Sequence, residues 1–419
     1  MSYIKNLCQG VYAQRIKELC VRYAVPLIII ADLVGIIAAV FWVSVMDIID
    51  IDLRYWIPYL QKHNYLAMYH EICTAEVLSP AILNYPPIYP TYLFFLARCV
   101  LPEIVTVDST NATDLFFQVA MKSSSVIFMI ITQAVLYVRV SKKAALVWTY
   151  CLPLWYISFV WGQRDVLLGL FIVMMLYSMH QKKIYEPCLW FVAACLLKPQ
   201  SAYLAVIYFL YLFTSEHSVR QKLASLVMGL AVGLAAYMPF MIYEQDLLLP
   251  FKVYLRVAGF GTGAFSWCAA NFYWILNKCN VANAAFLVPV MLLVIIGLAV
   301  IYYLRTKNII MTGFVYMFMI FMFSIGQHER YVVYHMCIFS LIYILSNKFS
   351  IEFWTMSFVY GLYLIIANTL SCKVLLFDTL TLYENGYLYA ALLVTVIFNF
   401  TLLADLIRHK KELDNLPVV

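Results

Sequence analysis

The residues best suited to chemistry lie in six polar motifs between long apolar runs, and five of these motifs are short. The motifs are DIDLRYW at 50–56, NYPPIYP at 84–90, WGQRD at 161–165, LKPQ at 197–200, the segment 243–283 and GQHERY at 326–331. They bring together carboxylates, which can remove a proton from a hydroxyl group, and cationic side chains, which can bind phosphate. These residue types favour chemistry on a phosphate-bearing substrate.

The first motif supplies two candidate bases. Asp50, Asp52, Arg54 and Trp56 stand close together directly after the first apolar run. A carboxylate there can act as general base toward a sugar hydroxyl. The competing interpretation is a solvated start of a loop, with Asp47 as a further member of the acidic run.

The last motif supplies candidate phosphate ligands. Arg330 offers a bidentate fork for phosphate, and His328 can donate to the same group. Charged residues between apolar runs are costly and normally face a cavity or a partner. The competing interpretation is a tight turn that contains a local pair between Glu329 and Arg330.

The middle motifs allow both a structural and a site-lining interpretation. Gln163, Arg164 and Asp165 interrupt one apolar stretch, and Lys198, Pro199 and Gln200 interrupt another. The prolines after Tyr85 begin a helix. The segment 243–283 holds Lys252, Arg256 and several glycines, which suggests a lid, but it lacks the GK[ST] ending of a phosphate loop.

The composition predicts an integral membrane protein. Of 419 residues, 65% are hydrophobic and 12% are charged, whereas a soluble domain is about half apolar and about a quarter charged. The net charge of +6 comes from small basic clusters rather than one stripe, so we expect no nucleic-acid partner. The 11 Cys residues show no zinc spacing and are expected to be buried thiols.

The lengths of the apolar runs predict an all-α polytopic protein with about 12 transmembrane spans. A crossing helix needs about 20 mostly apolar residues, or fewer where it is tilted or buried in protein. The spans are expected near residues 24–46, 116–138, 144–161, 165–180, 184–198, 201–215, 223–243, 284–304, 309–326, 331–346, 351–370 and 386–406.

The basic residues predict the orientation in the membrane. Residues 85–102 are apolar but begin with prolines and contain Arg98, so we treat them as an interfacial or re-entrant helix within one long outer loop, 47–115. Of the 28 Lys and Arg residues, 17 then lie at cytoplasmic ends of spans, as the positive-inside rule requires. Both termini are then cytoplasmic, and all the polar motifs fall on the outer side.

The order of the motifs resembles that of the GT-C superfamily of membrane glycosyltransferases. The closer resemblance is to bacterial proteins related to GPI mannosyltransferase II, and a more distant one is to the dolichyl-phosphate-glucose-dependent glucosyltransferases of N-glycan assembly. The matching residues are Asp50, Asp52, Arg54, Trp56, Tyr85-Pro86-Pro87, Trp161-Gly162-Gln163, Asp165, Lys198-Pro199-Gln200 and His328-Glu329-Arg330-Tyr331.

The resemblance implies one integral membrane domain over 1–419, with a GT-C-like catalytic module at about 1–240 and a more variable helical module at about 241–419. It implies an inverting hexosyltransferase that moves a monosaccharide from a polyprenyl-phosphate donor to a glycan or lipid-linked acceptor. Short loops and modest length favour a bacterial plasma membrane and an undecaprenyl carrier. The reaction would take place on the extracytoplasmic side.

The resemblance also implies a role for each candidate residue. Asp50 or Asp52 is the catalytic base, with a narrow preference for Asp50. No metal is required, although an Asp-x-Asp pair leaves room for a divalent ion. The expected donor-phosphate ligands are Arg330, His328, Arg54, Lys198 and Arg256, and the expected lining residues are Tyr85, Gln163, Asp165, Gln200, Glu329 and Trp56.

Two other functions remain as alternatives. A polysaccharide polymerase or ligase also uses lipid-linked sugars, but such proteins usually carry a large outer loop late in the chain, whereas the longest expected outer loop here follows the first span. A transporter or flippase would be expected to show internal repeats and charged residues near the middle of spans. The sequence shows no repeat.

Overall fold

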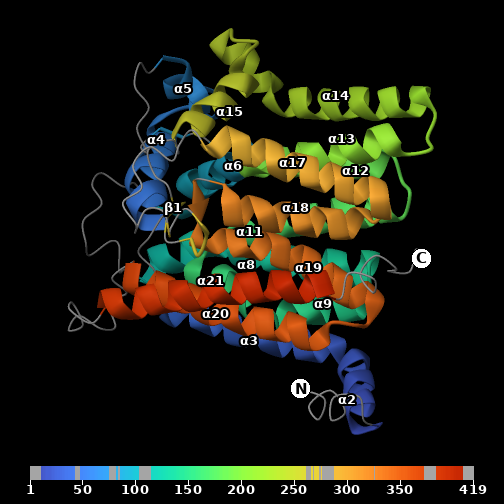
Figure 1. Cartoon of the computed structure of the whole chain (residues 1–419). Helices are drawn as coiled ribbons and strands as arrows, with labels where there is room; N and C mark the ends of the chain where they lie inside the picture. The colour runs from blue at the N-terminus through green and yellow to red at the C-terminus, as the bar shows by residue number, and fades with distance from the viewer. Residues whose placement is uncertain are drawn as a thin grey trace.

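The computed structural model describes residues 11–42, 48–74, 82–83, 85–102, 115–260, 266–267, 269–272, 275, 287–324, 326–371 and 384–408. These residues are almost entirely helical (Figure 1), which confirms the predicted all-α class. Within them, the strands β1 (Ser266–Trp267) and β2 (Gln327–His328) form one short parallel pair, in which Ser266 lies opposite Gln327.

The body of the molecule is a bundle of apolar helices. Within the described residues, five are long and apolar enough to cross a membrane, or six if one bent pair counts as a crossing. The long helices are α3 (Ala24–Phe41), α8 (Leu115–Arg139), α14 (Val219–Glu244), α17 (Leu287–Thr306) and α20 (Ser350–Ser371). The other bundle helices are α11 (Asp165–His180), α12 (Tyr185–Leu197), α13 (Ala205–Thr214), α18 (Ile309–Phe323), α19 (Val332–Ser346) and α21 (Glu384–Arg408).

The expected span at 144–161 is not one straight helix. It consists of α9 (Lys142–Thr149), followed by α10 (Leu152–Trp155) and the π-helix η4 (Tyr156–Trp161), and the two parts meet at 69°. Pro153 lies in the first turn of α10, where its missing N–H donor is tolerated but where a helix cannot run through from α9. In the same way, the expected span at 201–215 begins with a 3-10 helix, η5 (Pro199–Leu204).

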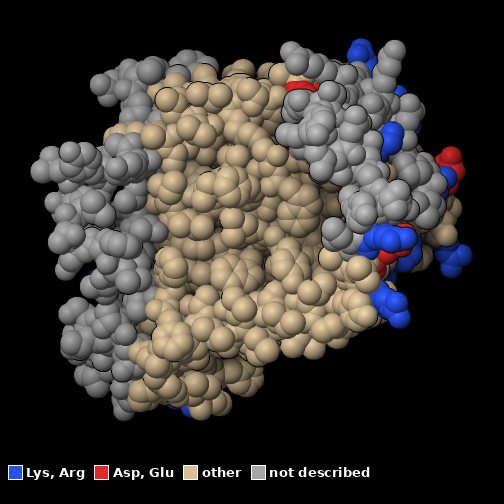
Figure 2. Space-filling view, turned by 90° about the horizontal axis from the view of Figure 1, so that it is seen from below, with Lys and Arg blue, Asp and Glu red and all other residues tan. Residues whose placement is uncertain are grey.

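The basic turns, which carry Lys and Arg at 139–143, 182–183, 220–222, 305–307 and 348, gather at one end of the bundle (Figure 1). The helices lie horizontally in Figure 1. The C-terminal ends of α8, α11, α13 and α21 are at the right, together with the amphipathic helix α2 (Val11–Arg22). Figure 2 shows a broad face with no charged side chain over its middle and with blue Lys and Arg at the same right-hand end. A wide uncharged belt with charge at its edge is the surface expected of a protein embedded in a bilayer.

Short helices occupy the opposite end. They are η1 (Ile48–Trp56), α4 (Ile57–Lys62), η2 (Tyr65–Tyr69), α5 (His70–Thr74), α6 (Ile88–Phe95), η3 (Leu96–Val100) and α15 (Leu249–Phe260). The guanidinium group of Arg98 donates to the carbonyl oxygens of Leu60 (3.1 Å) and His63 (2.6 Å). The apolar segment 85–102 is therefore tied to the other short helices of its own loop (Figure 1).

A buried lysine holds the point where the chain leaves the first long helix. The ammonium group of Lys122, on α8, donates to the carbonyl oxygens of Ala39 (3.2 Å) and Trp42 at the C-terminal end of α3. The last carbonyl groups of a helix have no partner within that helix, and a cation is favourable there. Lys122 thereby fixes the C-terminal end of α3 against α8.

Candidate active site

The first part of the site surrounds Asp52. This carboxylate lies on η1 with its side chain 2% exposed, and it accepts hydrogen bonds from the Tyr89 hydroxyl and from Arg164 Nη2 (3.1 Å). The guanidinium carbon of Arg164 lies 3.6 Å from the centre of the Tyr89 ring. Trp56 and Tyr85 meet edge to face at 5.5 Å beside this pair. The helix η1 thus supplies a buried carboxylate within an aromatic wall.

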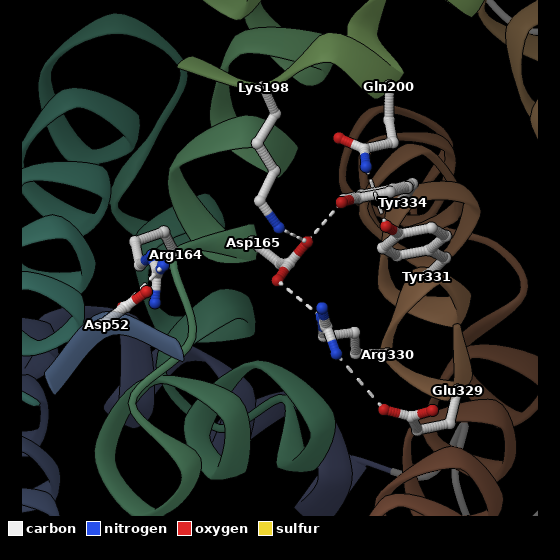
Figure 3. A network of polar contacts seen from close by, with 9 residues as sticks. All are labelled: Asp52, Arg164, Asp165, Lys198, Gln200, Glu329, Arg330, Tyr331 and Tyr334. Atoms are coloured by element: carbon white, nitrogen blue, oxygen red, sulfur yellow. Dashed lines mark hydrogen bonds and ion pairs between the residues drawn. The ribbon is translucent and has the colours of Figure 1, made fainter. Parts of the chain in front are cut away.

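The second part of the site surrounds Asp165, the first residue of α11. Its Oδ1 accepts hydrogen bonds from Lys198 Nζ (2.8 Å) and from the Tyr334 hydroxyl. Its Oδ2 lies 3.6 Å from Arg330 Nε, and Arg330 Nη1 lies 3.4 Å from Glu329 Oε1. Figure 3 shows Asp165 at the centre of these contacts, with the ion pair between Asp52 and Arg164 beside it.

Aromatic side chains extend this second cluster. Gln200 Nε2 donates to the Tyr331 hydroxyl over 3.0 Å, and Tyr331 stacks on Tyr334 at 5.3 Å. The His328 ring lies 5.2 Å from the Tyr331 ring. The guanidinium carbon of Arg330 lies 5.7 Å from the Trp161 ring. The cationic residues therefore stand beside electron-rich ring faces, which favour positive charge.

Local sequence explains how the two clusters become neighbours. Gly162 ends η4 with φ at +82°, a left-handed conformation that glycine adopts without a steric cost. The chain then turns into α11 through Gln163, so Arg164 points to Asp52 while Asp165 points to Lys198 and Arg330 (Figure 3). The WGQRD motif thus joins η1, the end of α12 and the start of α19.

The buried charges of the site balance. Arg164, Lys198 and Arg330 are the cations, Asp52, Asp165 and Glu329 are the anions, and each of the six is at most 6% exposed. Burying an isolated charge is costly, whereas a paired and hydrogen-bonded charge is tolerated. The balance explains how six charges fit within an apolar bundle. A bound anion would add negative charge and draw a cation away from its carboxylate.

The network is compact in this structure. A cavity of about 10 Å³ lies beside it, between Gln200, Phe321, Gln327, Tyr331 and Tyr334 among others, and such a volume suits a single water molecule. Arg54 is exposed, and Tyr85, Gln200 and His328 are half-buried. These four residues are the part of the candidate site that a ligand can reach without displacing the buried network.

The structure brings together most of the residues predicted from the sequence. Asp52, Asp165, Lys198, Gln200, Glu329 and Arg330 belong to the network, Trp56, Tyr85 and His328 flank it, and Gln163 is buried between Gly162 and Arg164. Arg54 is exposed on η1. The side chains of Asp50 and Arg256 lie outside the described part of the structure.

The sequence-based list of site residues omitted four that make direct contacts in the network: Tyr89, Arg164, Tyr331 and Tyr334. Three of them, Tyr89, Arg164 and Tyr331, lie within the polar motifs of the sequence, whereas Tyr334 follows the last motif. A signal for the tyrosines was present, because Tyr89 follows Tyr85 by four residues and Tyr334 follows Tyr331 by three. Residues at these spacings share one face of a helix.

Among the described residues, no group of three or more His, Cys, Asp or Glu side chains is arranged to hold a metal ion. The Asp50 carboxylate, which the sequence suggested as half of an acidic pair, is outside this comparison because its side chain is not described. The described cations of the network are Lys and Arg, which stabilise a phosphate directly.

Comparison of the sequence with protein-family models and with curated proteins gives no match.

Proposed function

We propose that the chain is an inverting glycosyltransferase with a GT-C-like arrangement. It would transfer a monosaccharide from polyprenyl phosphate to a glycan or lipid-linked acceptor on the outer face of the plasma membrane. About 12 helical segments would cross or partly cross the bilayer, with both termini in the cytoplasm. The single observation that carries the proposal is a pair of neighbouring buried ion clusters, Asp52 with Arg164 and Asp165 with Lys198 and Arg330 (Figure 3). They lie at the end of the bundle opposite the basic turns.

The proposed reaction is one displacement at the anomeric carbon. A carboxylate of the first outer segment removes the proton of the acceptor hydroxyl, and the acceptor oxygen forms a bond to the anomeric carbon. The bond from that carbon to the phosphate oxygen breaks, and polyprenyl phosphate leaves with the electron pair. Cations near the leaving phosphate stabilise charge that develops in the transition state. One carboxylate suffices for this transfer, in contrast to the pair used for hydrolysis.

The contact distances favour Arg330 over Lys198 as the ligand of the donor phosphate. Lys198 Nζ lies 2.8 Å from Asp165, whereas Arg330 lies 3.6 Å from Asp165 and 3.4 Å from Glu329. The longer contacts are easier to exchange for a phosphate, to which Arg binds with two parallel hydrogen bonds. In this scheme Lys198 mainly neutralises Asp165 and positions it.

The base stays open between two residues. Asp52 already accepts bonds from Tyr89 and Arg164, and such bonds stabilise the charged carboxylate and weaken it as a base. This favours Asp50 as the proton acceptor and Asp52 as the residue that orients Arg164. Both belong to η1 and lie two residues apart in the chain.

The test offers the purified full-length protein a panel of polyprenyl-phosphate hexoses with membrane lipid extract as acceptor source, and measures release of polyprenyl phosphate. Asp50→Asn and Asp52→Asn are compared with Asp405→Asn, a control near the C-terminal end of α21 at the opposite end of the bundle (Figure 1). Turnover in the wild type and control, with loss in one η1 variant that still binds donor, supports the proposal. Absence of release from every donor would refute the transferase assignment.

A further inference from the structure

A second cavity lies at the end of the bundle opposite the candidate active site. Its volume is about 340 Å³, which is within the range of small-molecule sites. Residues of α2, α3, α9, α19 and α20 line it, among them Val21, Leu27, Val147 and Trp354. Its walls are mainly apolar and aromatic, and they contain one ammonium group, that of Lys143.

Lys143 is fixed at the wall of this cavity. Its Nζ donates to the carbonyl oxygens of Tyr343 (3.2 Å) and Ile344 (3.3 Å) and to Asn347 Oδ1 (2.9 Å). It also lies 4.2 Å from the centre of the Tyr343 ring. These contacts tie the start of α9 to the end of α19 and hold a positive charge beside an apolar space.

The surroundings of the cavity are positively charged. The elements that form it and the turns next to them carry Arg15, Arg22, Lys142, Lys143 and Lys348, against the carboxylates of Glu18, Asp32 and Glu352. Basic residues beside an apolar surface at the cytoplasmic leaflet attract anionic lipid headgroups. The wall formed by α2 is a basic amphipathic helix with an exposed Leu19, a type of helix that lies in the membrane interface.

We propose that this cavity holds an acyl chain of an anionic phospholipid, with the lipid phosphate beside the exposed Arg22 and Lys142, which directly adjoin the lining residues Val21 and Lys143 in the chain. Charge complementarity selects an anionic over a zwitterionic headgroup, and the apolar walls select a lipid tail over a soluble anion. The site is separate from the network around Asp165, so it does not depend on the proposed transferase reaction.

Trp354 lines the cavity and serves as an internal reporter. The full-length protein is reconstituted in phosphatidylcholine vesicles that contain a small fraction of dibrominated phosphatidylglycerol or dibrominated phosphatidylcholine, and tryptophan quenching is measured. Phosphatidylglycerol is expected to quench more strongly at equal mole fraction. Trp354→Phe is expected to abolish this excess.

Two further variants, each with a matched control, distinguish lipid binding in the cavity from general contact of lipid with the protein surface. Val147→Phe fills the cavity, whereas its control Val227→Phe adds the same group on α14, where Val227 is 66% exposed. Lys142→Gln is expected to lower the preference for phosphatidylglycerol about fivefold, which equals about 1 kcal/mol, and Lys222→Gln on α14 is its control. Loss of the excess in Val147→Phe and Lys142→Gln, with both controls unchanged, supports the site.

Equal quenching by the two brominated lipids in the wild type would overturn the proposal, because it would show only unselective contact. Persistence of the excess in Trp354→Phe, or an excess in Lys142→Gln that is as large as in the wild type, would also overturn it. If Val147→Phe fails to elute as a folded protein in size-exclusion chromatography, Trp354→Phe and Lys142→Gln decide the outcome by themselves.

Discussion

At the residue scale, Asp165 holds its two cations at different distances. The contact to Lys198 is 2.8 Å and the contact to Arg330 is 3.6 Å, although all three side chains are buried. The attraction between two charges weakens as their distance grows. Arg330 is therefore held less strongly by Asp165 than Lys198 is, and a negatively charged ligand can compete for it more easily. One prediction tests Arg330 as a ligand of the proposed donor phosphate, and a second tests Asp165 as the carboxylate that stabilises the cluster.

The first prediction concerns Arg330. We expect Arg330→Ala to lower turnover about 100-fold or more, the size of effect found when a donor to a developing oxyanion is removed. Arg330→Lys should fall between this variant and the wild type, because it keeps the charge but loses the bidentate fork. The measurement is release of polyprenyl phosphate, with Lys222→Ala as control. Unchanged kcat/KM in Arg330→Ala would contradict the assignment.

The second prediction concerns Asp165, which is fully buried. Asp165→Asn leaves Lys198 and Arg330 without their shared carboxylate, so we expect the free energy of unfolding to fall by about 3–5 kcal/mol. Asp246→Asn breaks a more exposed pair with Lys252 and should cost no more than about 1 kcal/mol. Unfolding in detergent measures both. Equal costs for the two variants would argue against a central role for Asp165.

At the element scale, small residues let helices approach closely. A Cβ atom added at Gly35 would lie 2.5 Å from the Phe159 ring, where α3 crosses η4. Similar contacts occur at Gly169 with Cys337, Gly313 with Leu176 and Gly361 with Leu152. Membrane helices rely on such close packing, because lipid tails are as apolar as the helix surfaces and burial alone provides little driving force.

The prediction at this crossing is a loss of stability in Gly35→Val. The added methyl groups must displace the Phe159 ring, so we expect a cost of about 1–3 kcal/mol. Gly297→Val on α17 is the control, because a Cβ atom there meets nothing within 4 Å. Thermal unfolding in detergent compares the two variants. A larger loss in Gly297→Val would contradict the packing of α3 on η4.

The thiol of Cys73, on α5, gives a prediction that depends on pH, because it lies near two carboxylates at the turn from α14 to α15. Burial first, and then the carboxylates of Glu244 and Asp246, raise the pKa of the Cys73 thiol to about 11. Because maleimides react with the thiolate, labelling of Cys73 should rise about tenfold per pH unit from pH 8 toward 11. Asp246→Asn removes one negative charge, lowers this pKa and speeds labelling at pH 8, whereas Asp405→Asn leaves it unchanged. Half-maximal labelling near pH 8.5 in the wild type would contradict this.

At the scale of the whole molecule, the two ends of the bundle differ in charge and in content. One end carries the basic turns and α2, and the other carries the short helices and the buried network (Figures 1 and 2). The positive-inside rule then predicts which end faces the cytoplasm. Two exposed cysteines mark the ends, Cys20 on α2 and Cys99 on η3.

The prediction is that a membrane-impermeant maleimide labels Cys99 but not Cys20 in intact cells. Each cysteine is tested in a variant from which the other cysteines have been replaced, and permeabilised cells provide the control in which both react. Labelling of Cys20 in intact cells, with protection of Cys99, would place the network on the cytoplasmic side and would contradict a reaction on the outer face.

Much of the architecture could be predicted from the sequence. Apolar runs predicted helices in every region where the structure describes one of the bundle, because a stretch of apolar residues needs its backbone hydrogen bonds satisfied within the helix. The failures were local. The break between α9 and α10 at Cys151 was missed because periodicity and hydropathy do not distinguish a straight helix from two short helices joined at an angle.

The sequence by itself determined that this protein is helical, that it has the composition of a membrane protein, and that its polar motifs alternate with its basic turns. These are properties of neighbouring residues. Only the tertiary structure decided which cation meets which carboxylate. Asp52 pairs with Arg164 across 112 positions, and Asp165 is shared by two cations, Lys198 and Arg330, from different parts of the chain. Such pairs depend on how the helices pack in space, since a charge buried in an apolar bundle is stable only where its partner is brought to it.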